Sequence, residues 1–361
     1  MVKDQRAKNI ICDFDQEQFQ HDLIDWFQTV QRDLPWRKDK DPYKVWVSEI
    51  MLQQTKVDTV IPYFNRFIDK FPTLDDLAAA DEQEVLKAWE GLGYYSRARN
   101  LQNAVKEVAA EYNSKVPDTS EELASLKGVG PYTKGAILSI AYNLPEPAVD
   151  GNVMRVMSRV LLIDDDIAKS KTRRIFEDCV KEVIPETNPS DFNQGLMELG
   201  ALVCTPTKPS CLLCPVQNHC RAFSEGMQQD LPIKTKGKKQ KSVKYMAFLL
   251  VDTDGNYLIE QRPDKGLLAS LWQFPMAPLA ETDEEHAGNW FTQVYGLKID
   301  SLVKVDTIKH VFSHLIWEID VFAGAIVSGG LTSERAKFVS RKELESYPFP
   351  VSHQKILKHI D

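Results

Sequence analysis

Several features are missing from this 361-residue sequence, and each absence excludes a class of protein. No uninterrupted apolar run is long enough to cross a membrane. The first residues, Met1–Gln5, contain no apolar segment of a secretory signal. We therefore expect a cytoplasmic protein with no membrane partner.

Positive charge is also scarce, because the sequence has 44 Lys and Arg against 52 Asp and Glu, which gives a net charge of −8. The overall field therefore gives no sign of nucleic-acid binding. This counts only weakly against a DNA-binding protein, because local clusters of Lys and Arg decide phosphate contact. The length and the 43% hydrophobic content suit two or three globular domains.

Cysteine is scarce, and in a cytoplasmic chain the six cysteines do not indicate a disulfide framework. Cys12 and Cys179 are isolated, and we expect two ordinary buried thiols. The other four fall within 17 residues in a proline-containing loop: Cys204, Cys211, Cys214 and Cys220.

The spacing Cys-x6-Cys-x2-Cys-x5-Cys is typical of a metal site. Four sulfur ligands suit either tetrahedral zinc or a [4Fe–4S] cluster. Zinc sites commonly pair two Cys-x2-Cys units and only one is present, but spacing alone does not choose. The metal's expected role is structural.

Hydrophobic periodicity predicts two domains of different class. Residues 1–225 read as all-α, with helices at 15–30, from Asp41-Pro42 to about 52, and at 59–71, 74–90, 97–112 and 120–126. Residues 244–361 read as α+β, with strands at 245–251, 257–260 and 314–322 and helices at 284–295 and 340–347. Residues 226–243 read as a basic linker. This linker is either only a flexible connection between the domains, or its positive charges can also follow a phosphate backbone.

The stretch Gly128-Val129-Gly130-Pro131 lies between two predicted helices. Glycines permit positive φ, and proline suits the first turn of a helix. The unpaired amides of that turn could hold a DNA phosphate, as in a helix-hairpin-helix. The alternative is a turn without any ligand.

Two carboxyl groups are candidates for acid–base chemistry. Glu49 has Val45, Trp46 and Leu52 at helical spacing, so burial should raise its pKa and keep a proton available. Asp150 precedes Gly151-Asn152 in a polar turn and should stay ionised. Such a pair suits cleavage of a glycosidic bond. The alternatives are a solvent-facing Glu49 and an Asp150 that only caps a helix.

The hairpin, the downstream Asp150 and the four-cysteine loop resemble the endonuclease III superfamily of DNA glycosylases. Three stretches are similar, nearly residue for residue, to the MutY-type adenine DNA glycosylases: residues 46–55 (WVSEIMLQQT), 91–100 (GLGYYSRARN) and 149–153 (VDGNV). The resemblance extends from about Phe19 to His353.

This resemblance implies a substrate, adenine mispaired with 8-oxoguanine or guanine in duplex DNA, and a [4Fe–4S] cluster in the cysteine loop. It makes Glu49 the acid that protonates adenine and Asp150 the carboxylate that stabilises the cationic sugar, supported by Tyr132 and Asn152. The adenine pocket would comprise Trp36, Arg37 and Gln194, and the base must leave the helix to reach it. A bacterial cytoplasmic monomer is the expected form.

Further positions match residues that contact DNA. The resemblance assigns Gln54, Leu92 and Tyr94 to wedging into the base stack, with Thr55 beside them, and Gly128, Val129 and Gly130 to the hairpin. For Gln54 and Tyr94 the alternatives are helix-end polarity and core packing.

In bifunctional relatives, the residue two beyond the second hairpin glycine is a lysine that attacks the sugar. Here that residue is Tyr132, while Lys134 lies on a different face of the helix. Without an amine nucleophile, water should complete the reaction. We expect a monofunctional glycosylase.

Residues 258–263 (LIEQRP) and 271–275 (LWQFP) match the strands before a Nudix box, so the second domain resembles a Nudix fold. The box itself is missing, because Met276-Ala277-Pro278 and His286–Phe291 stand in its place. A Nudix hydrolase needs those missing carboxylates to hold magnesium. The domain should therefore bind rather than cleave, and Phe312-Ser313-His314 matches the loop that reads 8-oxoguanine in the family.

Four functions remain in comparison: a monofunctional glycosylase, a strand-nicking lyase, a non-catalytic lesion-binding protein and a Nudix hydrolase. Tyr132 disfavours the lyase, the presence of Glu49 and Asp150 disfavours pure binding, and the missing box disfavours the hydrolase.

Overall fold

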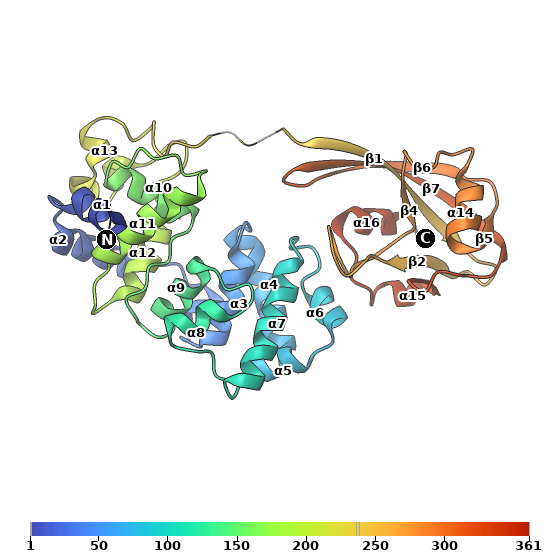
Figure 1. The fold of residues 1–361 in the computed structure, drawn as a ribbon, viewed down its shortest axis with the longest axis horizontal. Helices are drawn as coiled ribbons and strands as arrows, with labels where there is room; N and C mark the ends of the chain where they lie inside the picture. The colour runs from blue at the N-terminus through green and yellow to red at the C-terminus, as the bar shows by residue number, and fades with distance from the viewer. Residues whose placement is uncertain (1, 236, 238, 361) are drawn as a thin grey trace. The chain divides into compact units, whose positions relative to one another are not determined.

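The computed structural model describes residues 2–235, 237 and 239–360, and the chain divides into two compact units (Figure 1). The first unit comprises Met1–Ala78 and Asn103–Lys236, and the second comprises Ala79–Gln102 and Gly237–Asp361. Among the described residues, no helix has both the length and the apolar character that a membrane crossing requires. The predicted boundaries at residues 225 and 243 stay predictions.

Helices alone form the regular structure up to Ser224, which confirms the all-α prediction for the described part of that segment. The α-helices are α1 (Val2–Ile11), α2 (Gln16–Val30), α3 (Pro42–Leu52), α4 (Val57–Lys70), α5 (Leu74–Ala79), α6 (Glu82–Ala88), α7 (Ser96–Glu111), α8 (Ser120–Ser125), α9 (Pro131–Ile140), α10 (Gly151–Val160), α11 (Ser170–Val183), α12 (Pro189–Leu202) and α13 (Arg221–Ser224). Short 3₁₀ helices lie at Pro35–Arg37 (η1), Cys211–Leu213 (η2) and Gln217–His219 (η3).

Side-chain caps set several of these helix starts. Asp41 accepts a hydrogen bond from the Tyr43 amide at 2.8 Å, and Pro42 occupies the first helical position of α3. The single helix predicted over 74–90 is wrong, because Asp81 accepts from the Gln83 amide at 2.8 Å and starts α6 anew.

Two hydrophobic clusters of described residues contribute to the core of the first unit. One joins α1, α2, α10, α11 and α12 and includes the fully buried Phe19 and Phe192. The other joins α3 and α9 and contains Val45, Ala136, Ile140 and Ala148. Helix α12 contacts α2, α9 and α10, so it connects the two clusters. The candidate site lies where α3, α9, α10 and α12 meet.

The second unit is built around one mixed eight-stranded sheet, which confirms its α+β class. Its strands are β1 (Lys241–Val251), β2 (Tyr257–Gln261), β3 (Trp272–Gln273), β4 (Met276–Pro278), β5 (Leu297–Ile299), β6 (Val303–Val311), β7 (Leu315–Gly329) and β8 (Ala336–Val339). Strands β1 and β7 pair in parallel from Lys241↔Leu315 to Val251↔Ala325, and the other pairs are antiparallel.

Each face of this sheet has its own hydrophobic core. Helix α14 (Ala287–Tyr295) packs Phe291 and Tyr295 against one face. Helices α15 (Arg341–Leu344) and α16 (Val351–Ile356) pack Leu344 and Ile356 against the other. Helix α14 carries no carboxylate at all.

The predicted linker is only partly free in the structure. Arg159 Nε donates to the Leu231 carbonyl at 2.9 Å, and Thr235 Oγ1 donates to Asp166 at 2.6 Å, so the chain is held to the first unit up to Thr235. Strand β1 begins at Lys241, inside the predicted linker. Two of its lysines, Lys236 and Lys238, lie outside the described residues.

Candidate functional site

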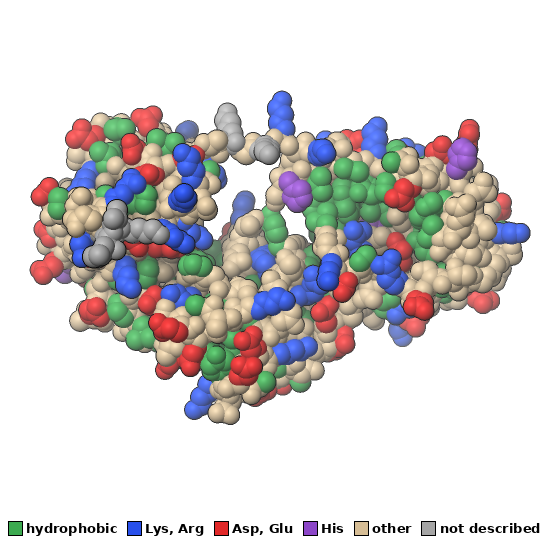
Figure 2. All heavy atoms as spheres, viewed as in Figure 1, with side chains coloured by type: hydrophobic (Ala, Val, Ile, Leu, Met, Phe, Trp, Pro, Cys, Tyr) green, Lys and Arg blue, Asp and Glu red, His purple; other side chains and the backbone are tan. Residues whose placement is uncertain are grey.

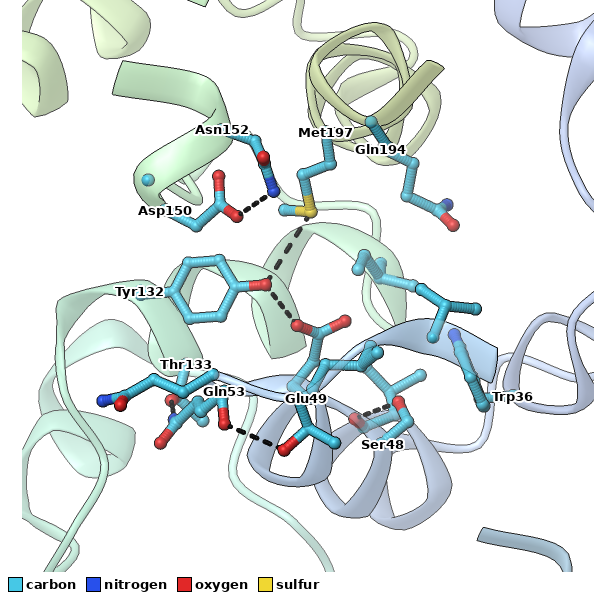
Figure 3. A pocket seen from close by; sticks show the side chains of 18 of the residues that line it. Trp36, Ser48, Glu49, Gln53, Tyr132, Thr133, Asp150, Asn152, Gln194 and Met197 are labelled. Carbon is cyan, nitrogen blue, oxygen red and sulfur yellow. Dashed lines mark hydrogen bonds between the residues drawn. The ribbon is translucent and has the colours of Figure 1, made fainter. Parts of the chain in front are cut away.

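A cavity of about 570 Å³ opens between α3, α9, α10 and α12 (Figure 3). All seven residues predicted for catalysis and the adenine pocket line it, together with four predicted DNA-contact residues. They are Glu49, Asp150, Tyr132, Asn152, Trp36, Arg37 and Gln194, and then Gln54, Thr55, Gly128 and Gly130.

Glu49 projects from α3 into this cavity and is only 4% exposed. Burial raises the pKa of its carboxyl to about 7, against a smaller lowering effect of the hydrogen bond from Tyr132. The Tyr132 hydroxyl donates to Glu49 Oε2 and also contacts Met197 Sδ at 3.8 Å. Glu49 therefore does not face solvent, and near neutral pH it is partly protonated.

Asp150 both caps α10 and lines the cavity. Its Oδ1 accepts from the Val153 amide at 2.7 Å, and its Oδ2 accepts from Asn152 Nδ2 at 2.8 Å. Burial raises the pKa of Asp150, while these hydrogen bonds and the Arg155 charge oppose the rise. Capping and a role at the cavity are thus compatible.

Arg155 holds Asn152 in place. Its Nη2 donates to Asn152 Oδ1 at 2.8 Å and to the Gly200 carbonyl at 2.9 Å, and its Nε donates to the Cys204 carbonyl at 2.9 Å. A chain of hydrogen bonds therefore leads from the first cysteine of the loop to the Asp150 carboxylate.

Lys134 is directed elsewhere, as expected from its place on α9. Its Nζ lies 2.6 Å from Ser120 Oγ and 3.3 Å from Glu146 Oε2. Tyr132, not Lys134, is the α9 side chain at the two carboxyl groups.

The predicted adenine-pocket residues form one side of the cavity. Trp36 is 6% exposed and meets the Phe64 ring edge-on at 5.4 Å between centroids. Arg37 Nε donates to Gln194 Oε1 at 3.0 Å. Gln194 and Met197 project from α12, across the cavity from Glu49 (Figure 3).

Arg32 and Glu198 are among the cavity residues that the sequence did not predict. Glu198 is 1% exposed and binds both Arg32 and Arg37. One signal could have revealed it: Glu198 is an acid in an apolar stretch, four residues after Gln194 and hence on the same helix face.

The hairpin differs from expectation in one respect. Gly128 has φ +86°, which favours glycine, but Gly130 has an ordinary φ of −90°. A Cβ added to Gly130 would meet no protein atom within 4 Å. Crowding within the protein therefore does not explain Gly130, and its open side is free for a ligand. Val129 lies in the same turn, and its amide donates to the Leu126 carbonyl at 3.2 Å.

Lys, Arg, Asp and Glu side chains are interspersed on the visible face of each unit (Figure 2). On that face, a phosphate contact would therefore rest on local groups and not on a field of one sign.

The second unit brings together two other predicted contact regions. The Tyr94 hydroxyl and Ser313 Oγ lie 2.5 Å apart. Tyr94 is 46% exposed with φ +48°, whereas Leu92 is only 7% exposed. Phe312 packs its ring against Trp317 at 4.8 Å and His310 at 4.5 Å, and Ser313 and His314 form the turn between β6 and β7. A wedging role would require Leu92 to leave its buried position.

The four clustered cysteines surround one small cavity, and none forms a disulfide. Arg159 Nη1 donates to Cys204 Sγ at 3.2 Å. In the part of the chain that the structure describes, no three His, Cys, Asp or Glu side chains are grouped so as to hold a metal ion.

Two family profiles match the chain. The profile described as "HhH-GPD superfamily base excision DNA repair protein" matches residues 47–182, and the profile of the Nudix domain matches residues 246–359. The adenine DNA glycosylase of Rattus norvegicus is 35% identical over 399 residues, covering 94% of this chain and 77% of the rat protein.

Among the solved structures, two examples resemble more than half of this chain. A thermostable thymine-DNA glycosylase superposes with a TM-score of 0.52 at 27% identity, covering 58% of this chain and 97% of that one. A trapped endonuclease III–DNA covalent intermediate gives 0.50 at 25% identity, covering 59% and 98%. This chain belongs to the adenine DNA glycosylases of the HhH-GPD superfamily of base excision DNA repair proteins.

Proposed function

We propose that the chain removes adenine that is mispaired with 8-oxoguanine or guanine in duplex DNA, by hydrolysis of the N-glycosidic bond and without cutting the strand. The observation that carries this proposal is the meeting of Glu49 and Asp150 at one cavity of about 570 Å³, with Glu49 buried. A flipped-out adenine would occupy that cavity.

Glu49 supplies the proton for the departing base. Its pKa of about 7 leaves a large protonated fraction at neutral pH, which is the condition for a general acid. Tyr132 donates to Oε2, so the other oxygen is left to carry the proton toward a ring nitrogen of adenine. Protonation makes adenine a better leaving group and draws electrons away from the sugar bond.

Asp150 stabilises the positive charge that develops on the sugar. The Val153 amide and Asn152 hold its carboxylate in one orientation, and both hydrogen bonds favour the ionised form. Water then attacks the sugar, because no amine nucleophile is available at this position: Tyr132 has a hydroxyl group, and the Lys134 amine is bound to Ser120 and Glu146. This supports a monofunctional reaction that leaves an abasic site.

Duplex binding would use the hairpin Gly128-Val129-Gly130, whose open side at Gly130 suits a phosphate. Gln54, Thr55, Leu92 and Tyr94 would contact the bases around the vacated position. The similarity to an endonuclease III structure solved with DNA supports a DNA substrate.

Recognition of the partner base would fall to Phe312, Ser313 and His314 in the second unit. Phe312 anchors the loop through its ring contacts and leaves the Ser313 hydroxyl at the surface beside Tyr94. A hydroxyl can donate to or accept from an oxidised purine.

Cys204, Cys211, Cys214 and Cys220 would hold a [4Fe–4S] cluster with a structural role. Each thiolate of such a cluster binds a different iron, so the four sulfurs lie around the cluster. A zinc ion, in contrast, requires its sulfur ligands to converge on one point. Four thiols around one cavity fit that donor set. The purified protein should contain about four irons per chain, which iron analysis and visible absorption would measure, and stoichiometric zinc would contradict the cluster.

The function is tested with a duplex that carries one adenine opposite 8-oxoguanine. We expect release of free adenine, measured by chromatography, with strand breaks only after alkali. Glu49→Gln is the matched control, since it keeps the side chain's shape and should bind the duplex without releasing adenine.

A lyase would give a different result. Strand scission without alkali, together with a borohydride-trapped adduct, would contradict the monofunctional reaction. If no adenine is released from either A·8-oxoguanine or A·G duplexes, the proposed substrate is wrong.

A further inference from the structure

The cavity wall contains a network that the proposed reaction does not yet use. Glu198 Oε1 accepts from Arg32 Nε at 2.7 Å, and its Oε2 accepts from Arg32 Nη2 at 3.0 Å and from Arg37 Nη2 at 3.0 Å. One buried carboxylate therefore holds two guanidinium groups.

Glu198 is ionised in this setting. Burial alone would raise the pKa of its carboxyl, but the hydrogen bonds and charges of Arg32 and Arg37 outweigh burial and hold the pKa below its ordinary value. Removing the negative charge would leave two partly buried cations close together without the carboxylate that binds both of them.

Arg37 transmits this anchoring to Gln194. Its Nη2 is bound to Glu198, its Nη1 donates to the Arg32 carbonyl at 3.1 Å, and its Nε donates to Gln194 Oε1 at 3.0 Å. All three nitrogens are committed to protein acceptors, and the side chain is only 14% exposed. Arg37 is therefore a fixed part of the wall rather than a mobile contact for a base.

The direction of the Gln194 amide follows from this chemistry. A guanidinium can only donate, so the end that faces Arg37 must be the oxygen. The nitrogen end lies 3.2 Å from Ser190 Oγ and 3.5 Å from the Ser190 carbonyl. One lone pair on Oε1 remains for a ligand. Of the two N–H groups of Nε2, one makes only the weak 3.5 Å contact with the Ser190 carbonyl, which a ligand acceptor could replace.

The groups of the Gln194 amide that remain for a ligand match the edge of adenine. Adenine offers an amino donor next to a ring-nitrogen acceptor, and glutamine can bind this pair with its oxygen and its nitrogen. Hypoxanthine has a carbonyl in place of the amino group, so the fixed oxygen of Gln194 would face another acceptor. If Arg37 no longer held the Gln194 amide, the amide could rotate and donate its N–H to the hypoxanthine carbonyl. The site would then no longer distinguish adenine from hypoxanthine.

We propose that Glu198 is a positioning residue that fixes the Gln194 amide through Arg37 and so sets the preference for adenine over hypoxanthine. The inference rests on the proposed excision of adenine. It assigns Glu198 no contact with the base.

The test compares single-turnover excision of adenine and of hypoxanthine opposite 8-oxoguanine. Glu198→Gln keeps the shape and removes the charge. Loss of a charged hydrogen bond should slow adenine excision by about 10- to 100-fold, with hypoxanthine excision nearly unchanged. Asp191→Asn, which also removes one charge from α12, should leave the ratio as in the unmodified protein.

A second background separates positioning from folding. In Gln194→Ala protein, Glu198→Gln should change the adenine rate by less than about twofold, because the amide through which it acts is gone. If Glu198→Gln does not fold, Arg37→Lys carries the same test, since an ammonium cannot bridge Glu198 and Gln194 as the guanidinium does. Glu198→Asp should restore part of the ratio.

Three results would overturn the inference: an unchanged ratio, an equal slowing for both bases, or a full effect of Glu198→Gln in the Gln194→Ala background. Failure of the unmodified protein to release adenine would refute the proposed function itself, and the inference with it. The two failures are therefore distinguishable.

Discussion

Glu49 is held between two opposing influences, burial that raises its pKa and the Tyr132 hydroxyl that lowers it. If protonated Glu49 is the acid, excision should slow as the pH rises through about 7, approaching a tenfold loss per pH unit above that value. Single-turnover rates between pH 5.5 and 9 would measure this.

Tyr132→Phe serves as the internal check on that profile. It removes the hydrogen bond that lowers the pKa of Glu49, so the alkaline limb should move to higher pH. A limb that stays in place, or moves to lower pH, would mean that another group controls the rate.

The same burial predicts a conflict between stability and activity. The folded-state pKa of Glu49 lies above its unfolded value, so its protonation stabilises the fold at low pH, and this contribution is lost as the pH rises from about 4.5 to 7. Glu49→Gln is neutral throughout and should therefore gain stability over the unmodified protein across that range. The gain should level off near about 3 kcal/mol, since each pKa unit corresponds to about 1.4 kcal/mol.

Melting temperatures at pH 5 and pH 8 would test this prediction. The exposed Glu186→Gln is the control and should show no such trend. A Glu49→Gln protein that is less stable than the unmodified protein at pH 8 would contradict the burial argument.

Sequence patterns could predict Glu49 because its apolar neighbours lie within one helix, at Val45, Trp46 and Leu52. They could not predict the bond between Arg32 and Glu198, because these residues are 166 positions apart and only the packing of α2 and α12 brings them together. The orientation of the Gln194 amide could not be predicted either, because it too depends on a contact between residues far apart in the sequence.

At the scale of elements, the hairpin between α8 and α9 offers a matched pair of substitutions. Gly128→Ala should destabilise the protein by about 1 kcal/mol or more, because φ +86° is strained for alanine. Gly130→Ala should destabilise the protein less, since its φ is ordinary and nothing beyond its chain neighbours lies near the added methyl group, which leaves only the weaker N-cap of α9.

Duplex affinity should show the reverse order. Gly130→Ala places a methyl group where a phosphate would approach, so its duplex dissociation constant should rise more than that of Gly128→Ala although it loses less stability. Unchanged affinity for Gly130→Ala in a titration with fluorescent duplex would remove the hairpin from the DNA-contact surface.

Two helix starts with a local signal were predicted correctly, whereas the cap at Asp81 was missed and a boundary set by strand pairing was predicted wrongly. Asp41-Pro42 correctly marked the start of α3, and Pro131 that of α9. Strand β1 begins at Lys241 because its backbone pairs with β7 from Leu315 onward, whereas the basic character of residues 226–243 had suggested linker instead. A strand's edge of this kind depends on a partner some seventy residues away, which no local pattern contains.

At the scale of the whole chain, the grouping of Ala79–Gln102 with residues beyond 236 had no sequence signal. Trp272 Nε1 donates to Gln83 Oε1 at 2.9 Å, and the Phe349 amide donates to Glu90 Oε1 at 2.7 Å. These polar contacts join segments about 190 and 260 positions apart. The family resemblance assigned base-stack contacts to Tyr94 and partner-base recognition to Ser313, but it did not indicate that the two hydroxyls meet.

That meeting supports a last prediction, on the choice of partner base. Ser313→Ala should lower the preference for A·8-oxoguanine over A·G duplexes by about tenfold, the effect of one hydrogen bond to an oxidised base, while the A·G rate stays unchanged. Ser313 is the better site for this test than Phe312, whose ring packs against Trp317 and whose loss would disturb the fold. Tyr94→Phe is the control: it keeps the ring but removes the bond to Ser313. If Ser313→Ala slows both duplexes equally, the loop contributes to binding in general and does not read the partner base.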